Sequence, residues 1–467
     1  MEPPKSQLIQ RATSVAEIPR AFRPNPLSAG EMEFYSDSLN SCRANHLQRR
    51  IQDDLIESVE FGFFFKGVLY GNRGSGKSTE VNRLLDVDEI KKRFIVVRLD
   101  ALDELNPQTF SVVEVLSLLI ANVIIKCREV CGSRGQAFHE SWLMENDLRD
   151  QLKPFFPDLQ SGISEAKKTE GSGEINIAQT LKLAVRFGRD RKEDFAKHSG
   201  SLSGLKEVLT KLVQAVKTKL PDCELLVVGE NFDKEQIPPQ LLIDTFVKYS
   251  ALLKDLPLHL FFTLPVPFVY SYGDQLAFPR EKRYPIYDVP VFNETHGEHR
   301  PGIKALTELV EMRADVKAIF GPGALDLLLK ASGGDLYLLF AMTNKASRIA
   351  KYRAEDDSES KVQILRKDAV VVVREQLSIF RNEMGSAPNT KDSTWEDKRK
   401  KLRQIYENDA DGRVPDEVLY DLLRRRAVLF CNGKGRYAVH PLAVEMLREN
   451  FPNEPDFYKG GGLDLDK

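Results

Sequence analysis

A glycine-rich run has the residue types and spacing of a phosphate-binding loop. The stretch from Gly71 to Ser78 fits the pattern Gly-x-x-x-x-Gly-Lys-Ser. Glycines let the backbone curl so that its N–H groups point at phosphate oxygens, and a helix opening in the loop adds partial positive charge. In this pattern Lys77 reaches the β- and γ-phosphates and the Ser78 hydroxyl coordinates Mg²⁺. We therefore predict that ATP with Mg²⁺ is bound by Gly71, Asn72, Arg73, Gly74, Ser75, Gly76, Lys77, Ser78 and Thr79.

The flanking sequence supplies the strand and the helix that such a loop needs. The dense apolar run at 61–70 predicts a buried parallel strand. On the other side, Val81, Leu84 and Leu85 have the spacing of an amphipathic helix. The alternative, a chance match in an irregular loop, would lack this context on both sides.

An acidic residue at the end of a second strand must hold the metal through water. The apolar run at 224–228 predicts such a strand, and Glu230 and Asp233 follow it. In that position Glu230 orients the Mg²⁺ shell and Asp233 lies near the attacking water. The alternative is that both acids merely cap the strand on a solvated edge. This alternative stays open because the usual metal-holding residue is Asp, whereas position 230 is Glu.

The other patterns predict a three-layer α/β P-loop NTPase core with a parallel sheet, then an α-helical lid and a small winged-helix domain. Apolar runs at 94–99, 258–263 and 286–291 predict three more strands, and two helices before a hairpin predict the winged helix. The predicted division is an irregular N-terminal segment (1–37), the core (38–295, with an insertion at 133–200), the lid (296–385), the winged helix (393–455) and a disordered tail (456–467).

Composition narrows the function classes. The chain has 467 residues and a net charge of −2, so any contact with nucleic acid must use a local patch. Five scattered cysteines argue against a disulfide scaffold and favour a reducing compartment. No signal peptide and no membrane span are expected, because the most apolar stretch, at 112–125, contains polar residues. We predict a cytoplasmic protein.

Taken together, the motifs resemble those of the AAA+/STAND group of P-loop ATPases, which includes apoptotic-type signalling ATPases and origin-recognition ATPases. The stretch 227–234 is similar to the group's second motif, and the stretch 331–337 to its lid-helix opening. The run at 260–265 is similar to the sensor-1 strand, whose polar tip would be Thr263, a catalytic residue by this resemblance. Three positions depart from the group's pattern and weaken the case for fast hydrolysis: Glu230, Asn231 and Tyr337.

The resemblance also gives His440 a role. In apoptotic-type members a histidine near this point of the winged helix contacts the ADP β-phosphate and holds a closed state. By that likeness His440 is a nucleotide-binding residue. The alternative is an ordinary structural histidine beside Pro441.

The resemblance implies an ATP-binding and slowly hydrolysing switch that controls assembly with a partner protein on another chain, in a bacterial defence system, with homo-oligomers possible. The alternative is a nucleic-acid-binding ATPase that resembles origin-recognition or transposition-regulator proteins. A third hypothesis is a nucleotide-bound scaffold without turnover. Basic clusters at 398–401 and 424–426 fit either phosphate contacts or solvated helix faces.

Overall fold

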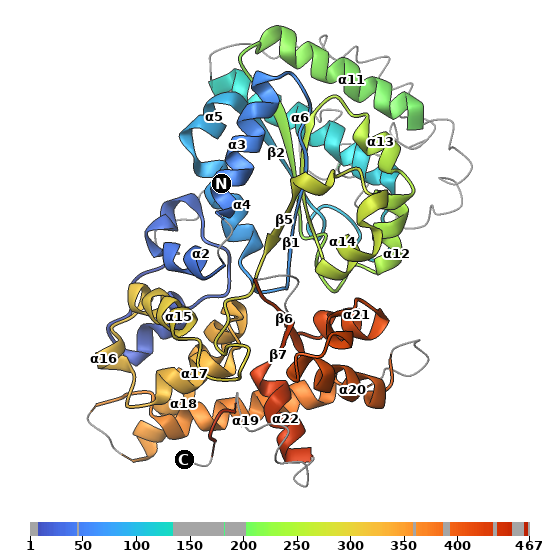
Figure 1. Cartoon of the computed structure of the whole chain (residues 1–467). Coiled ribbons are helices and arrows are strands. Elements are labelled where there is room, and N and C mark those ends of the chain that lie inside the picture. Colours follow the sequence, from blue (N-terminus) through green and yellow to red (C-terminus); the bar gives the residue numbers. More distant parts are fainter. Residues whose placement is uncertain are drawn as a thin grey trace, which may run out of the picture. The chain divides into compact units, whose positions relative to one another are not determined.

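The computed structural model of the chain (Figure 1) describes residues 8–43, 46–133, 182, 202–357, 361–385, 393–432, 437–450 and 462–465. Nearly all of the predicted insertion at 133–200 lies outside the described residues, as do positions 386–392 of the linker and 433–436 of the hairpin turn. The chain divides into two compact units. The first is Met1–Leu47, Gly71–Arg83 and Pro285–Lys467; the second is Gln48–Tyr70 and Leu84–Tyr284.

A five-stranded sheet forms the α/β core. Its strands are β1 (Lys66–Gly71), β2 (Phe94–Asp100), β3 (Glu224–Glu230), β4 (His259–Leu264) and β5 (Arg283–Ile286). They are arranged in the order β2-β3-β4-β1-β5, and the pairs β2–β3, β3–β4 and β4–β1 are parallel. The predicted parallel α/β core is confirmed. The fifth strand, however, ends at Ile286, where the sequence predicted that it would begin.

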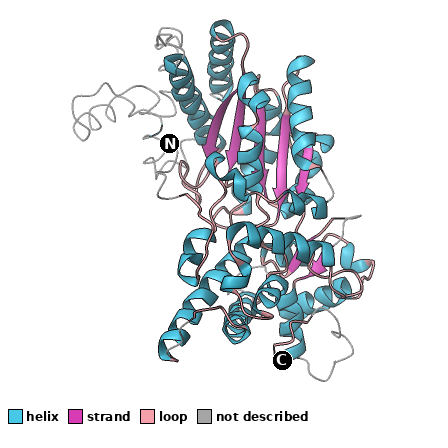
Figure 2. Cartoon of the chain, turned by 90° about the vertical axis from the view of Figure 1, so that its left-hand side faces the viewer, coloured by secondary structure: helices cyan, strands magenta, loops and turns pink. Residues whose placement is uncertain are grey.

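Burial explains why these runs become central strands. Every residue of β1 and β4 is buried, and β3 is buried from its second residue onward. Figure 2 shows helices on both faces of the sheet. Within its described residues, the second unit contains the helices α3 (Leu47–Glu60), α5 (Asp88–Arg93), α6 (Val112–Ser133), α11 (Leu202–Lys219), α12 (Pro239–Leu242), α13 (Ser250–Lys254) and α14 (Val266–Tyr272), with the π-helical turn η6 (Ile243–Val247) between α12 and α13.

The start of β1 differs from the prediction. Phe61, Phe63 and Phe64 were assigned to the strand, but they lie in the turn after α3 and their side chains are substantially exposed. The strand begins only at Lys66, whose ammonium donates to the carbonyls of Leu256 and Leu258, each at 2.7 Å. An apolar run alone does not distinguish a strand from the turn that leads into it.

The lid and the winged helix belong to the first unit. The lid consists of α15 (Arg300–Arg313), α16 (Val316–Ile319), α17 (Ala324–Ala331), α18 (Leu336–Asp356) and α19 (Arg366–Glu383). The winged helix consists of α20 (Trp395–Tyr406), α21 (Glu417–Arg424), β6 (Val428–Phe430), β7 (Tyr437–Val439) and α22 (Pro441–Asn450). The antiparallel pairing of β6 with β7 confirms the predicted hairpin, whereas α19 and α22 were not predicted.

The two ends of the described chain differ from their predicted irregular state. The N-terminal segment forms the short helices η2 (Val15–Glu17), α1 (Ile18–Ala21) and η3 (Ala29–Phe34). Its Ala12 exchanges backbone hydrogen bonds with Arg313 and Asp315 at 2.8 Å, next to the end of α15. Near the other end, Leu463 and Leu465 are buried within the predicted tail. Among the helices of the described ranges, none is long and apolar enough to cross a membrane.

Candidate nucleotide-binding site

The phosphate loop, residues 71–79, lies between a strand and a helix as predicted. Strand β1 ends at Gly71, and α4 (Lys77–Asp86) begins at Lys77. Gly74 and Gly76 have φ angles of 82° and 93°, a left-handed backbone that glycine adopts without strain. The buried Lys77 ammonium donates to the carbonyls of Gly71 and Asn72, both at 2.8 Å. The loop therefore has the curl that a phosphate cradle requires and holds its own lysine inside it.

Residues of the N-terminal helices support the loop and α4. Arg43, the last residue of α2 (Asp37–Arg43), is only 2% exposed and donates to the carbonyl of Ser75 at 2.7 Å. It also lies 3.6 Å from Glu80, which accepts a hydrogen bond from the Tyr35 hydroxyl at 2.7 Å. These residues were not predicted, because nothing about a single arginine on a short helix indicates a partner 32 positions away.

A buried aspartate connects the phosphate loop to the winged helix. Asp288 accepts hydrogen bonds from the Asn72 amide group at 2.6 Å and from the Phe430 backbone at 2.8 Å. The Asp288 backbone N–H in turn donates to the carbonyl of Phe430 at 2.7 Å. Complete burial raises the pKa of Asp288 to about 6, against the lowering effect of these hydrogen bonds. No local pattern in the sequence indicates this bridge.

The pKa of Asp288 predicts a pH dependence of stability. Because its folded-state pKa lies above the ordinary 3.8, the folded chain binds more protons than the unfolded chain between about pH 4 and pH 6. The free energy of unfolding should therefore fall as pH rises through this window, by about 2 kcal/mol between pH 4.5 and pH 7. The Asp288→Asn variant should lose this component. Urea unfolding of both proteins at the two pH values checks it, and an equal pH response in both would contradict it.

The lid also contacts the phosphate loop. Asp335 caps α18 by accepting from the Leu338 N–H at 3.0 Å, and its other carboxylate oxygen pairs with Arg426 of the winged helix. A Cβ atom placed on Gly74 would lie 2.1 Å from the Asp335 carboxylate. The carboxylate is therefore packed directly on the loop, and a side chain at position 74 has no room.

Gly74→Ala is expected to destabilise the first unit by about 2–4 kcal/mol, because it adds a collision to the strain of a positive φ angle. Gly62→Ala is the matched control. Gly62 has a similar φ of 69° but no atom within 4 Å of its Cβ position, so this variant should lose only about 1–2 kcal/mol. Urea unfolding gives both values. Equal losses would show that Asp335 is not packed on the loop.

The second unit positions the predicted metal-side acid. Glu230 is the last residue of β3 and is mostly buried. Its carboxylate accepts from Arg98 of the neighbouring strand at 2.8 Å. Burial raises the pKa of Glu230 above its ordinary value, and the Arg98 guanidinium acts against this rise. The structure therefore places Glu230 at the carboxyl end of a central strand, as the sequence predicted.

The other predicted catalytic residues lie near the same edge of the sheet. Thr263 is buried in β4 opposite Leu69 of β1, and its hydroxyl lies 3.4 Å from the carbonyl of Gly229. Asp233 is in the turn after β3. Asn231, at a φ of 62°, donates its amide group to Asp100 at 2.6 Å. This hydrogen bond holds Asn231 against β2. Asn231 is not among the predicted catalytic residues.

The first unit and the second unit each contain a predicted magnesium ligand with an oxygen donor. The described part of the chain has no cluster of three or more His, Cys, Asp or Glu side chains able to hold a metal alone. Mg²⁺ in such sites needs only one or two protein oxygens, and the phosphates and water supply the rest. The Ser78 hydroxyl on α4 and the Glu230 carboxylate are oxygen donors of the required kind.

His440 occupies a different environment from the one that the resemblance implied. It is fully buried, its Nε2 lies 3.1 Å from the Ser332 carbonyl, and its Nδ1 accepts from the Leu442 N–H at 3.2 Å. Burial lowers the pKa of His440 to about 4, so the ring is neutral at physiological pH with the proton on Nε2. In this conformation His440 holds the turn before α18 and offers no charge to a phosphate. Its contact with ADP stays a prediction.

Comparison with known proteins gives matches among solved structures alone. No protein-family model and no curated protein matches the chain. The chain is similar to a Walker-type ATPase of Pyrococcus abyssi, with 15% identity, 92% of this chain and 99% of that chain covered, and a TM-score of 0.40. It is also similar to Cdc6p from Pyrobaculum aerophilum, with 10% identity, coverages of 94% and 98% and a TM-score of 0.38.

A third similar structure is the ORC1 protein of Aeropyrum pernix in complex with DNA, with 12% identity, coverages of 87% and 92% and a TM-score of 0.35. All three TM-scores lie below 0.5. The fold is therefore assigned from the chain's own strand order, phosphate loop and winged helix. The signalling and defence part of the resemblance stays a prediction.

Proposed function

We propose that the chain binds ATP with Mg²⁺ at the phosphate loop and hydrolyses it slowly. The observation that carries this is the loop itself, which follows a buried strand, opens a helix and encloses the Lys77 ammonium. Bound phosphates would replace the two carbonyls that now accept from Lys77. The Ser78 hydroxyl would coordinate the metal, which stabilises the charge on the transferred phosphate. Glu230 is the proposed metal-side acid. Asp233 and Thr263, which lie near Glu230 at the same edge of the sheet, are the other proposed catalytic residues.

The nucleotide would control the contacts that the lid and the winged helix make with the phosphate loop. Asp288 and Asp335 each place a carboxylate beside that loop, and both are connected to the winged helix. Because phosphate is an anion, its arrival in the loop changes the balance of charge at both contacts. A switch of this kind would act on a partner, either a protein on another chain, as in a defence system, or a nucleic acid.

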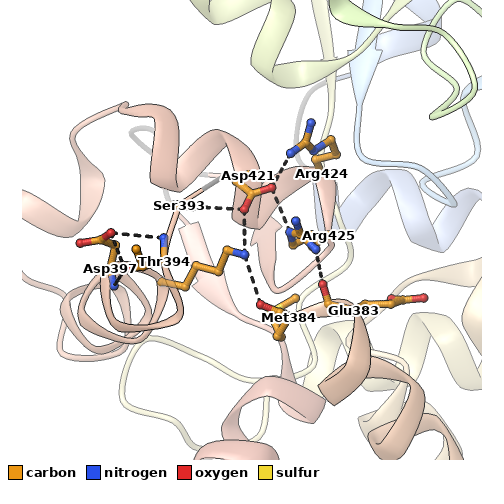
Figure 3. Close-up of polar contacts among 9 residues, drawn as sticks. Glu383, Met384, Ser393, Thr394, Asp397, Asp421, Arg424 and Arg425 are labelled. Carbon is orange, nitrogen blue, oxygen red and sulfur yellow. Dashed lines mark hydrogen bonds and ion pairs between the residues drawn. The ribbon is translucent and has the colours of Figure 1, made fainter. Parts of the chain in front are cut away.

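Nucleic acid is the second candidate partner. Its phosphates would contact the basic clusters at 398–401 and 424–426, so the pairing of these side chains matters. Figure 3 shows that Arg424 and Arg425 both point toward Asp421, at 2.6 and 2.9 Å. Lys398 is buried and pairs with the same carboxylate at 3.2 Å. Lys401 is buried too and donates to Asp416 at 2.8 Å. Much of the basic charge counted in the sequence is therefore neutralised inside the winged helix.

A binding assay separates the two partners. If the winged helix binds duplex DNA, affinity should fall steeply as salt rises, because phosphate contacts release counterions. Fluorescence anisotropy with a labelled duplex, with ATP or ADP present, gives this measurement. A protein partner recovered by pull-down from a chain with no affinity for DNA would favour the protein-directed switch. Steady-state phosphate release excludes or confirms turnover in either case.

A further inference from the structure

Arg426 occupies a backbone position that does not favour arginine. It follows the end of α21 with a φ of 58°, in the left-handed region. Its N–H donates to the carbonyl of Leu423 at 3.1 Å, and the Ala427 N–H donates to the carbonyl of Leu422 at 2.9 Å. This pair of bonds is the helix-ending motif in which glycine, or sometimes asparagine, usually occupies the left-handed position. An arginine in this conformation costs about 1–2 kcal/mol of backbone strain, which the contacts of its side chain have to offset.

The side chain of Arg426 reaches the phosphate loop through two lid residues. It forms an ion pair with Asp335, whose carboxylate packs on Gly74. Its guanidinium also lies 5.7 Å from the ring centre of Tyr337, and the guanidinium of Arg73 in the loop lies 5.4 Å from the same ring centre. The winged helix thus contributes a cation at the loop, and a carboxylate neutralises it.

Arg43, which also lies at this loop, differs from Arg426 in its burial and in the contacts of its guanidinium. Arg43 is almost wholly buried. It donates to a loop carbonyl and lies beside Glu80, so it stabilises the backbone of the loop. Arg426 is about one-fifth exposed, and the anion that it binds is on the lid, not on the loop. A phosphate that entered beside Gly74 would be repelled by Asp335 and attracted by Arg426. The two anions would therefore compete for one guanidinium.

We propose that Arg426 is a ligand for a nucleotide phosphate. Without nucleotide it pairs with Asp335, and the bound phosphate displaces that carboxylate from the guanidinium. The inference rests on the proposed binding of ATP at the phosphate loop and adds to it a residue from the winged helix. By this exchange the winged helix senses whether the loop is occupied. Arginine suits the role because its planar fork binds either a carboxylate or a phosphate through two parallel hydrogen bonds.

The test measures the affinity of fluorescent ATP and ADP analogues for the full chain and its variants. Arg426→Gln should weaken binding of at least one nucleotide by about 10- to 100-fold, the value of one charge-assisted contact. Asp335→Asn should tighten binding of the same nucleotide severalfold, because the competing charge is removed while asparagine still caps α18. In the double variant this gain should disappear. Arg424→Gln, two residues earlier and half exposed, is the control and should change nothing.

Four outcomes decide between the two proposals. If Lys77→Ala leaves nucleotide binding intact, the phosphate loop is not the site and the proposed function fails. If Lys77→Ala abolishes binding but Arg426→Gln and Asp335→Asn change affinity by less than twofold, or in the same direction, this inference alone fails. The Asp335→Asn/Arg426→Gly variant relieves the backbone strain and leaves no buried charge unpaired, so it keeps the test valid if Arg426→Gln does not fold. Weak binding by that folded variant supports the proposal, and wild-type affinity overturns it.

Discussion

Lys77→Ala is expected to abolish ATP binding, with a loss of at least about 100-fold in affinity. The ammonium now donates to two loop carbonyls at 2.8 Å, and a bound nucleotide would offer it two phosphates instead. Each charge-assisted hydrogen bond contributes about 1.5–3 kcal/mol, and alanine removes them together. Isothermal titration calorimetry with ATP gives the affinity of both proteins.

Lys91→Ala is the control for this variant, because Lys91 lies on the exposed face of α5 and pairs with Asp86. It should bind ATP like the wild type. If Lys77→Ala binds within about threefold of the wild type, a difference of only ~0.6 kcal/mol, the assignment of the phosphate loop is wrong.

Glu230→Gln is expected to keep nucleotide binding and to lower turnover by about 10²–10³-fold. The substitution keeps the shape of the side chain and removes the charge that would face Mg²⁺. Its structural cost should be small, because the lost ion pair is with Arg98, whose side chain is half exposed. Steady-state phosphate release, alongside calorimetric ATP binding, separates the two effects.

Glu224→Gln is the matched control, since Glu224 begins the same strand and pairs with Lys217 at its other end. Turnover of that variant should equal the wild-type rate. Asp233→Asn should slow turnover as well. Unchanged turnover in both Glu230→Gln and Asp233→Asn would mean that the metal-side acid lies elsewhere, and Asp100, opposite Glu230 on β2, would be the next residue to replace.

The parts of the site that follow a local pattern could be predicted from the sequence. A buried strand, a curled glycine loop and a helix start are neighbours in the chain. The residue types around Lys77 therefore predicted its position between the loop and the helix. Glu230 was found in the same way, as the acid at the end of an apolar run. Strand boundaries were less certain where aromatic residues such as Phe63 extend the apolar pattern into a turn.

The contacts that surround the loop could not be predicted, because they are tertiary and each uses a single residue. Arg43 and Asp288 stand in segments whose composition shows nothing unusual. Asp335 lies in the stretch that resembles the lid-helix opening, but only the fold brings any of the three to the loop. His440 is a different case. Its position in the winged helix suggested a contact with the ADP β-phosphate, which stays a prediction, but its burial and neutral ring could not be seen in one sequence.

The hydrogen-bonded bridge from Asn72 through Asp288 to Phe430 also determines when the protein can mature during synthesis. The two ends of the bridge are 430 − 72 = 358 residues apart in the chain. At a translation rate of 5–20 residues per second, about 20–70 seconds pass between their synthesis. During that interval the nascent phosphate loop exists without the winged helix that later contacts it. Strand β1, which ends at the loop, gains its neighbours β4 and β5 only when the chain has reached Ile286, so a nucleotide has access to a folded loop from then until Phe430 is made. If ATP binds there as proposed, the winged helix first meets a loop that is already filled.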